Sequence, residues 1–347
     1  MRLVRVPIAI VVGAMIAATP SSAVAHEGWG VVVDARGRVY VADIPANTIW
    51  RISPDGRFEA IGRGIHSHAL SLGPDSAVYG THASFTQPVV SVWRLDENGK
   101  FADVIPPTRG FPLAMQSFLR GPDGSVYSAS TYQYPEPPGG RQLYLLRWSP
   151  GGVIDTLAGG KSGHADGSGR AAQFESIDGM AWLSDGSIVV ADGPRLRRVR
   201  VDGNVESLGA SLTELRWDQD ILGVAVGPDG SIYAADFAGR VVHRANGARR
   251  DTLYQPGIFW SPTGVAATAD GIYVLEHPRA PLGIMGDIGI GPYLRVRKIS
   301  DDGNAVTLAS KWGRHSPKLA AVSVLLVAIV VSVRQVRRRR LRPAKVQ

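Results

Sequence analysis

Short apolar segments recur along the chain, and small groups of Gly, Pro, Asp or Asn residues separate them. The stretch GVAVGPDGSIYAAD at 223–236 shows the unit clearly, because two segments rich in small and β-branched residues flank Pro228-Asp229-Gly230. Proline presets φ at a turn, and glycine accepts the positive φ that such turns need. The pattern therefore predicts a β-hairpin here and strands along most of the chain.

The same hairpin phrase occurs six times. It reads DARGRVYVAD (34–43), GPDSAVYGTH (73–82), GPDGSVYSAS (121–130), LSDGSIVVAD (183–192), GPDGSIYAAD (227–236) and TADGIYVLE (268–276). The central residue of the phrase falls at 40, 79, 127, 189, 233 and 273. Repetition at a period of about 40 residues is typical of β-propellers, in which each repeat forms one blade. We therefore expect an all-β, six-bladed propeller.

Two further strand-like segments follow each phrase, so each blade is predicted to be a four-stranded antiparallel sheet. The third segments are 48–53, 91–96, 144–149, 196–201, 240–245 and 294–300; the fourth are 58–62, 101–105, 153–159, 205–209, 251–254 and 305–310. The first and last repeats both contain all four segments, so we expect the ring to close by contact between blades one and six. Insertions at 132–142, 160–176 and 278–292 are either binding loops or tolerated additions.

The N-terminal residues 1–25 resemble a secretory signal peptide. Arg2 and Arg5 precede an apolar run from Val6 to Ala18, and Ala23-Val24-Ala25 is a small-x-small cleavage site. An uncleaved N-terminal anchor is the alternative. The first interpretation places a propeller of residues 26–312 outside the cytoplasm.

A second uncharged apolar run extends from Leu319 to Val333 and is followed by a cluster of Arg and Lys residues. Such flanks favour a transmembrane helix over a core helix, and the positive-inside bias puts the basic end in the cytoplasm. We expect a linker at 313–318, a transmembrane helix at 319–336 and a basic cytoplasmic tail at 337–347. This makes an exported, single-pass membrane protein. A sorting signal is the alternative, although no LPxTG-like pentapeptide precedes the run.

The high isoelectric point comes from the two ends of the chain. Of 38 Lys and Arg, ten lie in the signal segment, at Lys318 and in the tail, which leaves 28 cations against 30 carboxylates and a net charge of −2 for 26–317. No basic stripe with interleaved aromatic residues occurs in this range, which argues against a nucleic-acid partner. The absence of cysteine excludes disulfides, thiolate metal sites and a cysteine nucleophile.

The residue just before each innermost strand is found by counting back from the turn glycine. These residues are Trp29, His68, Gln116, Asp178, Leu222 and Thr263. Innermost strands run side by side around a propeller axis, so these positions converge on one mouth of the central channel. We expect Trp29, His66, His68, Gln116 and Asp178 to form a ligand-binding arc there, although solvated loop positions would show the same pattern.

One repeat resembles a known motif closely. The stretch GHADGSGRAAQFESIDGMAWLSDGSIVVAD (163–192) resembles the NHL repeat, in which a DGxGxxAxF entry precedes a G-hydrophobic strand, a DG turn and a YVAD-like strand. The other five repeats match the strand part. The resemblance implies a six-bladed propeller over nearly all of 28–310.

The start of the expected mature chain, HEGW at 26–29 followed by VYVADIPANTIWRISPDG at 39–56, resembles the first blade of the SMP-30/gluconolactonase family. That family implies a divalent-metal-dependent lactonase. The resemblance assigns the metal to Glu27 and Asp178, with Ca²⁺, Mg²⁺ or Zn²⁺ as the ion. The sequence departs from the family at Leu222 and Thr263, and no Asn stands at any blade opening.

Three further histidines stand out in this pattern. His26 would become the N-terminal residue after cleavage and could chelate copper with a second histidine. His82 and the Glu276-His277 pair replace the Asp that ends the phrase elsewhere, where we expect it to accept backbone N–H bonds in the loop after the strand. Because they deviate from this pattern, His82 and His277 are candidate functional residues. We expect a binding module for a small molecule or a protein. The alternative is a metal-dependent lactonase or related hydrolase.

Overall fold

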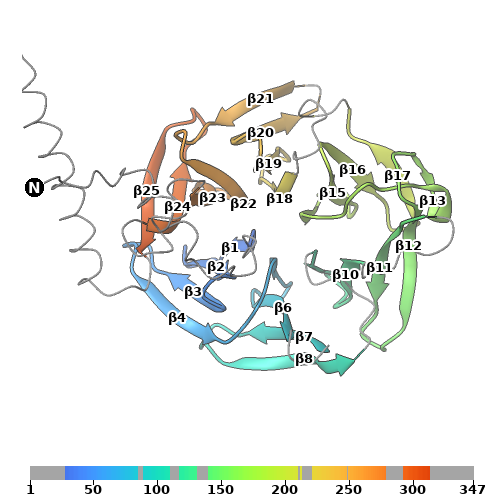
Figure 1. Cartoon of the computed structure of the whole chain (residues 1–347), viewed down its shortest axis with the longest axis horizontal. Helices are drawn as coiled ribbons and strands as arrows, with labels where there is room; N and C mark the ends of the chain where they lie inside the picture. Colours follow the sequence, from blue (N-terminus) through green and yellow to red (C-terminus); the bar gives the residue numbers. More distant parts are fainter. Residues whose placement is uncertain are drawn as a thin grey trace, which may run out of the picture.

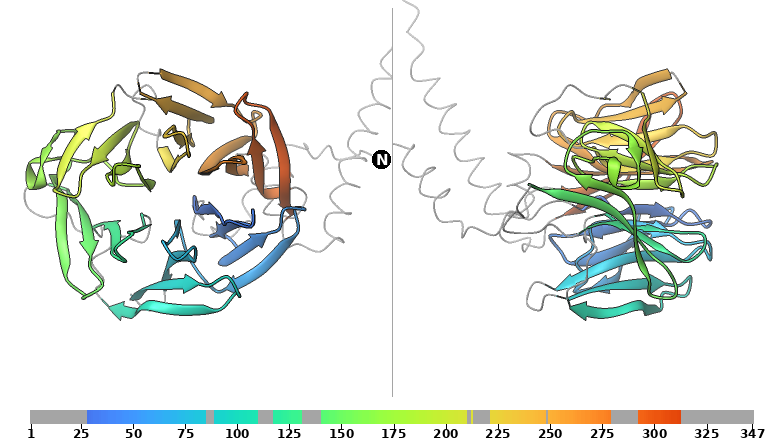
Figure 2. Two further views of the ribbon diagram at one scale, coloured as in Figure 1. Left: turned by 180° about the vertical axis from the view of Figure 1, so that it is seen from behind. Right: turned by 90° about the vertical axis from the view of Figure 1, so that its right-hand side faces the viewer.

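The computed structural model describes residues 28–84, 89–109, 117–130, 140–209, 212, 221–247, 249–278 and 292–312. Six antiparallel sheets form a ring around a central channel, with β1, β18 and β22 on the inside and β4, β8 and β12 on the outside (Figure 1). Seen from the side, the ring is a disk (Figure 2). The predicted all-β, six-bladed propeller is confirmed.

In the first three blades each sheet runs from an inner to an outer strand. Blade 1 consists of β1 (Val31–Val33), β2 (Val39–Asp43), β3 (Thr48–Ile52) and β4 (Phe58–Arg63). Blade 2 consists of β5 (Leu70–Leu72), β6 (Val78–Ser84), β7 (Val89–Leu95) and β8 (Phe101–Arg109). Blade 3 consists of β9 (Leu119–Arg120), β10 (Val126–Ala129), β11 (Gln142–Trp148) and β12 (Ile154–Lys161).

The remaining three blades follow the same order. Blade 4 consists of β14 (Met180–Trp182), β15 (Ile188–Asp192), β16 (Arg195–Val199) and β17 (Asn204–Ser207), with β13 (Gly167–Ser168) and the 3₁₀ turn η1 (Gly169–Ala171) before them. Blade 5 consists of β18 (Ile221–Val226), β19 (Ile232–Asp236), β20 (Val241–Asn246) and β21 (Arg249–Tyr254). Blade 6 consists of β22 (Trp260–Thr268), β23 (Gly271–Pro278), β24 (Pro292–Ile299) and β25 (Ala305–Trp312).

The insertion at 160–176 differs from the expected surplus loop. β13 pairs with β17, so blade 4 is a five-stranded sheet whose extra strand lies at its outer edge. Phe174 is fully buried in the core shared by blades 3 and 4, and the guanidinium of buried Arg197 bonds to Asp166, Asp192 and the carbonyls of Ala165 and Gln173. The NHL-like entry segment is therefore part of the scaffold.

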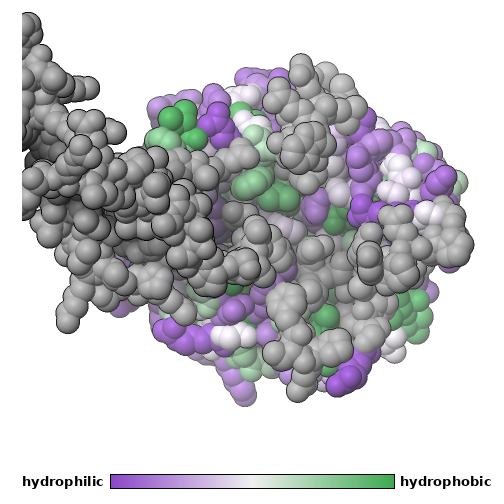
Figure 3. Space-filling model, viewed as in Figure 1, coloured by the Kyte–Doolittle hydropathy of each residue, from purple (hydrophilic) through white to green (hydrophobic). Residues whose placement is uncertain are grey.

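The hydrophobic core consists of six clusters of buried residues, one at each interface between neighbouring blades. Blade 1 packs against blade 6 through Val31, Val41 and Trp50 on one side and Leu275 and Val296 on the other. This contact closes the ring without a strand shared between the two ends, as expected. Around the described part of the edge, hydrophilic residues alternate with small groups of exposed apolar residues (Figure 3).

In five of the six blades, the residue at the centre of the hairpin phrase is a tyrosine that lies directly opposite an Arg or Lys of the third strand. The opposed pairs are Tyr40 with Arg51, Tyr79 with Arg94, Tyr127 with Arg147, Val189 with Arg198, Tyr233 with Arg244, and Tyr273 with Lys298. Turn aspartates pair with several of these cations, as Asp75 does with Arg94 at 2.8 Å and Asp270 with Lys298 at 2.6 Å. The phrase thus codes for a charged face at the hairpin turns, which we call the turn face.

No helix among the described residues is long and apolar enough to span a membrane. The segments expected to be the signal peptide, the linker, the transmembrane helix and the basic tail all lie outside the described residues, as do Glu27 and Gln116.

Candidate functional site at the mouth of the channel

The beginnings of the inner strands lie side by side at one end of the channel, which we call the mouth. The N–H groups of Trp29 and Gly30 both donate to the His68 carbonyl, at 3.0 and 2.7 Å. A glycine follows the opening residue in blades 1, 4, 5 and 6, and these four glycines lie against the neighbouring inner strand too closely to leave room for a Cβ. The close approach explains why glycine occupies these positions.

A histidine pair occupies the blade 1 and blade 2 side of the mouth. The Nε2 atoms of His66 and His68 lie 3.1 Å apart, and His66 Nδ1 lies 3.1 Å from the side-chain oxygen of Asn47. The indole of Trp29 packs edge-on against His68, with 5.4 Å between ring centroids. Trp29, His66 and His68 are all buried. The structure thus brings together three of the five predicted arc residues.

The hydrogen bonds of this pair define its protonation. With the Asn47 oxygen as acceptor, His66 carries its proton on Nδ1 and presents a lone pair at Nε2. His68 must then donate from Nε2, which leaves its Nδ1 as an acceptor in the neutral ring. The pair retains its Nε2–Nε2 hydrogen bond with one added proton and loses it with two. It is therefore suited to give or take a single proton.

His82, which stands where other phrases end in Asp, lies beside this pair and also accepts a backbone N–H bond, but from the segment before its inner strand. Its Nδ1 accepts a 3.0 Å hydrogen bond from the His66 backbone N–H. Asp43 and Asp236 accept backbone N–H bonds from Ala46 and Gly239 in the loops that follow them, as predicted. Burial lowers the pKa of His82, which favours the neutral ring that this acceptor role requires.

Asp192, the Asp that ends the phrase in blade 4, bonds to the equivalent segment, as His82 does. It accepts the N–H groups of Glu175 and Ser176, which precede the inner strand instead of following its own strand. The expected loop was therefore wrong for Asp192 and for His82, because in blades 4 and 2 the donor lies 16 or 17 positions earlier in the chain, before the inner strand.

The remaining mouth positions differ in character from blade to blade. Asp178 and Leu222 are half-buried, whereas Thr263 is fully buried. Glu27 and Gln116 lie outside the described residues. Within the described ranges no three His, Asp or Glu side chains gather around one point that could hold a metal ion. The described donors do not complete a divalent-metal site, so no catalytic step through a metal is derived, and the Glu27–Asp178 site stays a prediction.

Sequence reasoning missed one residue that contacts the histidine pair, Asn47. Asn47 follows the second strand of blade 1 and has a φ of 44°, a left-handed conformation that Asn tolerates better than most residues. Its oxygen reaches His66 across 19 positions. The signal for Asn47 was the loop PAN after the first phrase, where a polar residue with positive φ is common.

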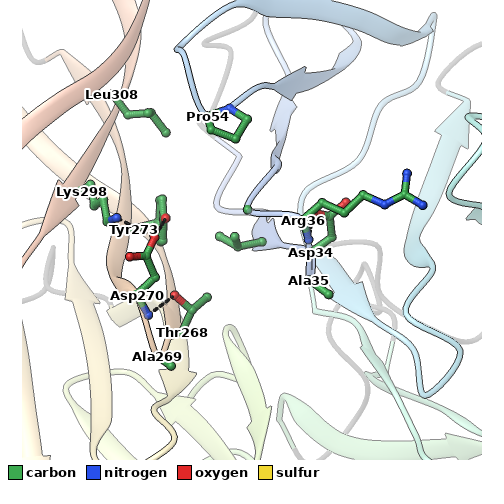
Figure 4. A pocket seen from close by; sticks show the side chains of 12 residues that line it. Asp34, Ala35, Arg36, Pro54, Thr268, Ala269, Asp270, Tyr273, Lys298 and Leu308 are labelled. Carbon is green, nitrogen blue, oxygen red and sulfur yellow. Dashed lines mark hydrogen bonds and ion pairs between the residues drawn. The ribbon is translucent and has the colours of Figure 1, made fainter.

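A second hollow lies on the turn face between blades 6 and 1. It has a volume of about 600 Å³ and is lined by Asp34, Arg36, Asp270 and Lys298, among others (Figure 4). The β22–β23 hairpin of blade 6 has only Ala269 and Asp270 between its paired ends, whereas the β1–β2 hairpin of blade 1 has the five residues 34–38. Its charged side chains are already paired, Arg36 with Glu97 at 2.7 Å and Asp270 with Lys298. The mouth is therefore the stronger candidate for a site.

No known family model matches the chain, and no curated protein matches it. Solved structures do resemble it. One is a gluconolactonase from Xanthomonas campestris, 12% identical with a TM-score of 0.52, covering 72% of this chain and 83% of that protein. Another is virginiamycin B lyase from Staphylococcus aureus, determined with quinupristin as a catalytically inactive His→Ala variant, 13% identical with a TM-score of 0.51 and coverages of 74% and 94%. At these identities the likeness concerns the fold: the chain is a six-bladed β-propeller of four-stranded antiparallel blades whose structural neighbours include gluconolactonases.

Proposed function

We propose that this protein is a binding propeller that holds a small polar molecule at the mouth of its channel. The observation that carries the proposal is the contact of Trp29 with the hydrogen-bonded pair His66 and His68. An aromatic ring beside a proton-sharing pair offers a ligand both an apolar surface and hydrogen bonds. The turn-face hollow lacks such a combination, because its charges are used in ion pairs.

The experiment is a thermal-unfolding screen of the full chain in detergent against neutral sugars, sugar acids, lactones and amides. We expect at least one compound class to raise Tm, since a ligand that binds only the folded state stabilises it. The variant His68→Leu should lower the affinity by about tenfold, the cost of one lost hydrogen bond with an unpaired partner. Arg36→Ala on the turn face is the matched control and should bind normally. Equal binding by His68→Leu would overturn the mouth as the site.

A second candidate is hydrolysis of a lactone. The pair His66–His68 supports it, because one ring presents a lone pair and the other an N–H. In such a reaction water attacks the carbonyl carbon while a base takes the water proton, and an acid protonates the ring oxygen as its bond to that carbon breaks. The likeness to a gluconolactonase agrees with this chemistry.

Lactone turnover is measured by pH-stat with the full chain, without added metal and with Ca²⁺, Mg²⁺ or Zn²⁺ in turn. Turnover that His66→Gln and His68→Gln each reduce by about 100-fold or more would support the histidine pair. Absence of turnover under all four conditions would leave the binding function alone. Turnover that needs a metal and is lost in Glu27→Gln would instead favour the predicted Glu27–Asp178 site.

We also propose that the propeller is exported and held at the membrane by residues 319–336. The support is the sequence of the two ends: a signal-like start, and an apolar run flanked by Lys318 and a basic tail. Protease added to intact cells should digest the propeller and spare the tail, and the chain should stay in the membrane after an alkaline wash. A propeller that is protected from the protease would overturn this orientation.

A further inference from the structure

The last described strand ends on the same side of the disk as the channel mouth. The first and third strands of each blade begin on this side, which we call the mouth face, and the second and fourth strands end there. In blade 6 Trp312, at the end of β25, pairs with Pro292 at the start of β24. Because β25 has eight residues and spans about 26 Å, the turn face lies on the far side of the disk from Trp312.

A short segment separates this strand from the apolar run that we propose as the membrane anchor. Residues 313–318 lie between Trp312 and Leu319, and a fully extended chain of that length covers at most about 25 Å. Such a link holds the mouth face close to the membrane surface, whereas the turn face is further away by the thickness of the disk (Figure 2). The mouth face is therefore the face placed to contact the bilayer.

Large apolar side chains are exposed on the mouth face around blade 6. Ile258 and Phe259, in the loop that joins β21 to β22, are 70% and 40% exposed, and Trp312 is 60% exposed. The Arg240 guanidinium of blade 5 donates to the Ile258 carbonyl at 2.9 Å, which holds this loop across the two blades. Exposed aliphatic residues occur on both faces, but Phe259 and Trp312 are the only exposed Phe, Tyr or Trp among the described residues. Aromatic rings with such exposure are typical of a membrane interface.

Cations are exposed on the same face in the three blades that follow blade 6 around the ring. The outer strands of blades 1, 2 and 3 end there with Arg63, Arg109 and Lys161, all exposed. No carboxylate among the described residues forms an ion pair with any of the three, whereas many cations of the turn face pair with turn aspartates. The carboxylates that end the second strands on the mouth face are buried, namely Asp43, Asp192, Asp236 and Glu276. The mouth face thus presents positive charge to solvent and keeps these negative charges inside.

We propose that the mouth face docks on the surface of an anionic phospholipid bilayer. The apolar residues around blade 6 enter the interface, and the cations of blades 1 to 3 contact the headgroups. The inference rests on the proposed membrane anchor and adds the orientation of the propeller and the chemistry of the lipid. A second copy of the chain fits this face less well, because its unpaired cations would meet like charges. In the docked state a ligand reaches the mouth through the hydrated headgroup layer.

The test uses single cysteines, since the chain has none of its own. The full-length variant Ile258→Cys is labelled with a polarity-sensitive fluorophore and reconstituted into vesicles of phosphatidylcholine with phosphatidylglycerol, with a quencher attached to the lipid chains. Val201→Cys is the matched control, because Val201 is 69% exposed but lies at a turn of blade 4 on the turn face. We expect the label at 258 to be quenched at least about fivefold more strongly than the label at 201.

Charge reversal tests the chemistry of the lipid. The triple variant Arg63→Glu, Arg109→Glu and Lys161→Glu should lower the ratio of docked to undocked protein by about 100-fold or more, because one cation near an anionic surface is worth about fivefold. High salt and vesicles of phosphatidylcholine alone should release the label in the same way. The matched control makes the same charge change on the turn face, with Arg57→Glu, Lys100→Glu and Arg200→Glu, and should dock normally.

The outcomes separate docking from anchoring. If the chain stays with the vesicles after an alkaline wash but the label at 258 is not quenched, docking is wrong and the anchor stands. If the wash removes the chain, the anchor is wrong, and docking, which depends on the short link, is wrong with it. A label that shifts to the blue without being quenched by the lipid would show that protein covers this face, which also overturns docking. Thermal unfolding of each variant checks its fold.

Discussion

The hydroxyl of Tyr293 donates a 2.7 Å hydrogen bond to the Oδ2 atom of Asp43, and the two residues are 250 positions apart. Asp43 ends the hairpin phrase of blade 1, and Tyr293 belongs to the third strand of blade 6. The same carboxylate accepts the indole N–H of Trp50 at 2.8 Å. The bond therefore ties the two ends of the propeller together at their buried seam.

Tyr293→Phe should weaken this closure. The change removes one hydrogen bond to a buried carboxylate and leaves the ring in place, so the free energy of unfolding should fall by about 1–2 kcal/mol. Urea unfolding followed by fluorescence measures the loss. The control is Tyr144→Phe, because the Tyr144 hydroxyl bonds to Gln142 on its own strand and closes nothing. Equal stability of the two variants would show that the seam does not depend on this bond.

Gly264→Ala tests the packing of the inner strands. A Cβ on Gly264 would overlap the carbonyl oxygen of Trp29, a rigid backbone atom in the next blade, so one strand must shift. We expect a loss of about 2–3 kcal/mol, typical of overpacked sites. Gly257→Ala is the matched control, since no atom of the described residues lies within 4 Å of its added Cβ. If Gly264→Ala unfolds with the same free energy as the wild type, the inner strands of blades 1 and 6 can move apart enough to admit the Cβ.

Much of the fold follows from the sequence, because each hairpin phrase codes for its own blade. The Asp, the turn Gly and the central Tyr of the phrase act within one hairpin, so their spacing is enough to place strands and the turn face. Asp229, for example, accepts the N–H and the hydroxyl of Ser231, two residues away. The resemblance to NHL repeats predicted the ring for the same reason.

The site was less predictable, because it depends on side chains that meet from different loops. His68 was found from its place before an inner strand, but its bond to His66 and the bond from His66 to Asn47 depend on the backbone of two loops. The unpaired Nε2 atom of His277 is less visible still, since only the folded structure shows that no partner among the described residues reaches it. Spacing along one chain contains no such information.

Arg197→Leu should disrupt the anchoring of the NHL-like entry segment in blade 4. Arg197 bonds to Asp192 and Asp166, each at 2.7 Å, and is almost fully buried. Without it Asp192 is a buried carboxylate with no ion partner from its own sheet, and its pKa, already raised by burial, rises further. Removing one partner of a buried pair costs about 3–5 kcal/mol.

The neighbouring Arg198 provides the control for that experiment. Its pair with Glu206 at 3.2 Å is partly exposed, so Arg198→Leu should cost less than about 1 kcal/mol. The double change Arg197→Leu with Asp192→Asn should recover part of the loss, because it removes the unpaired charge. Unfolding is followed by urea titration at neutral pH. Similar losses for Arg197→Leu and Arg198→Leu would mean that the buried guanidinium has no special role.

His277 should make the protein less stable as the pH falls. Its pKa in the folded protein, about 3, lies below the ordinary value of 6.5. Between these two pH values the imidazole is therefore protonated in the unfolded chain and neutral in the folded chain. The contribution of neutral His277 to the free energy of unfolding is fully present above pH 6.5 and declines as the pH falls towards 3. At about 1.36 kcal/mol per pKa unit, the loss amounts to at most about 5 kcal/mol.

Replacing His277 by Gln removes this titrating group but keeps a polar side chain in the same place. The difference in unfolding free energy between wild type and His277→Gln should therefore change between pH 7 and pH 4, with the wild type losing more stability. The carboxylates titrate in both proteins and cancel in the difference. A difference that stays constant over this range would mean that His277 is protonated in the folded protein.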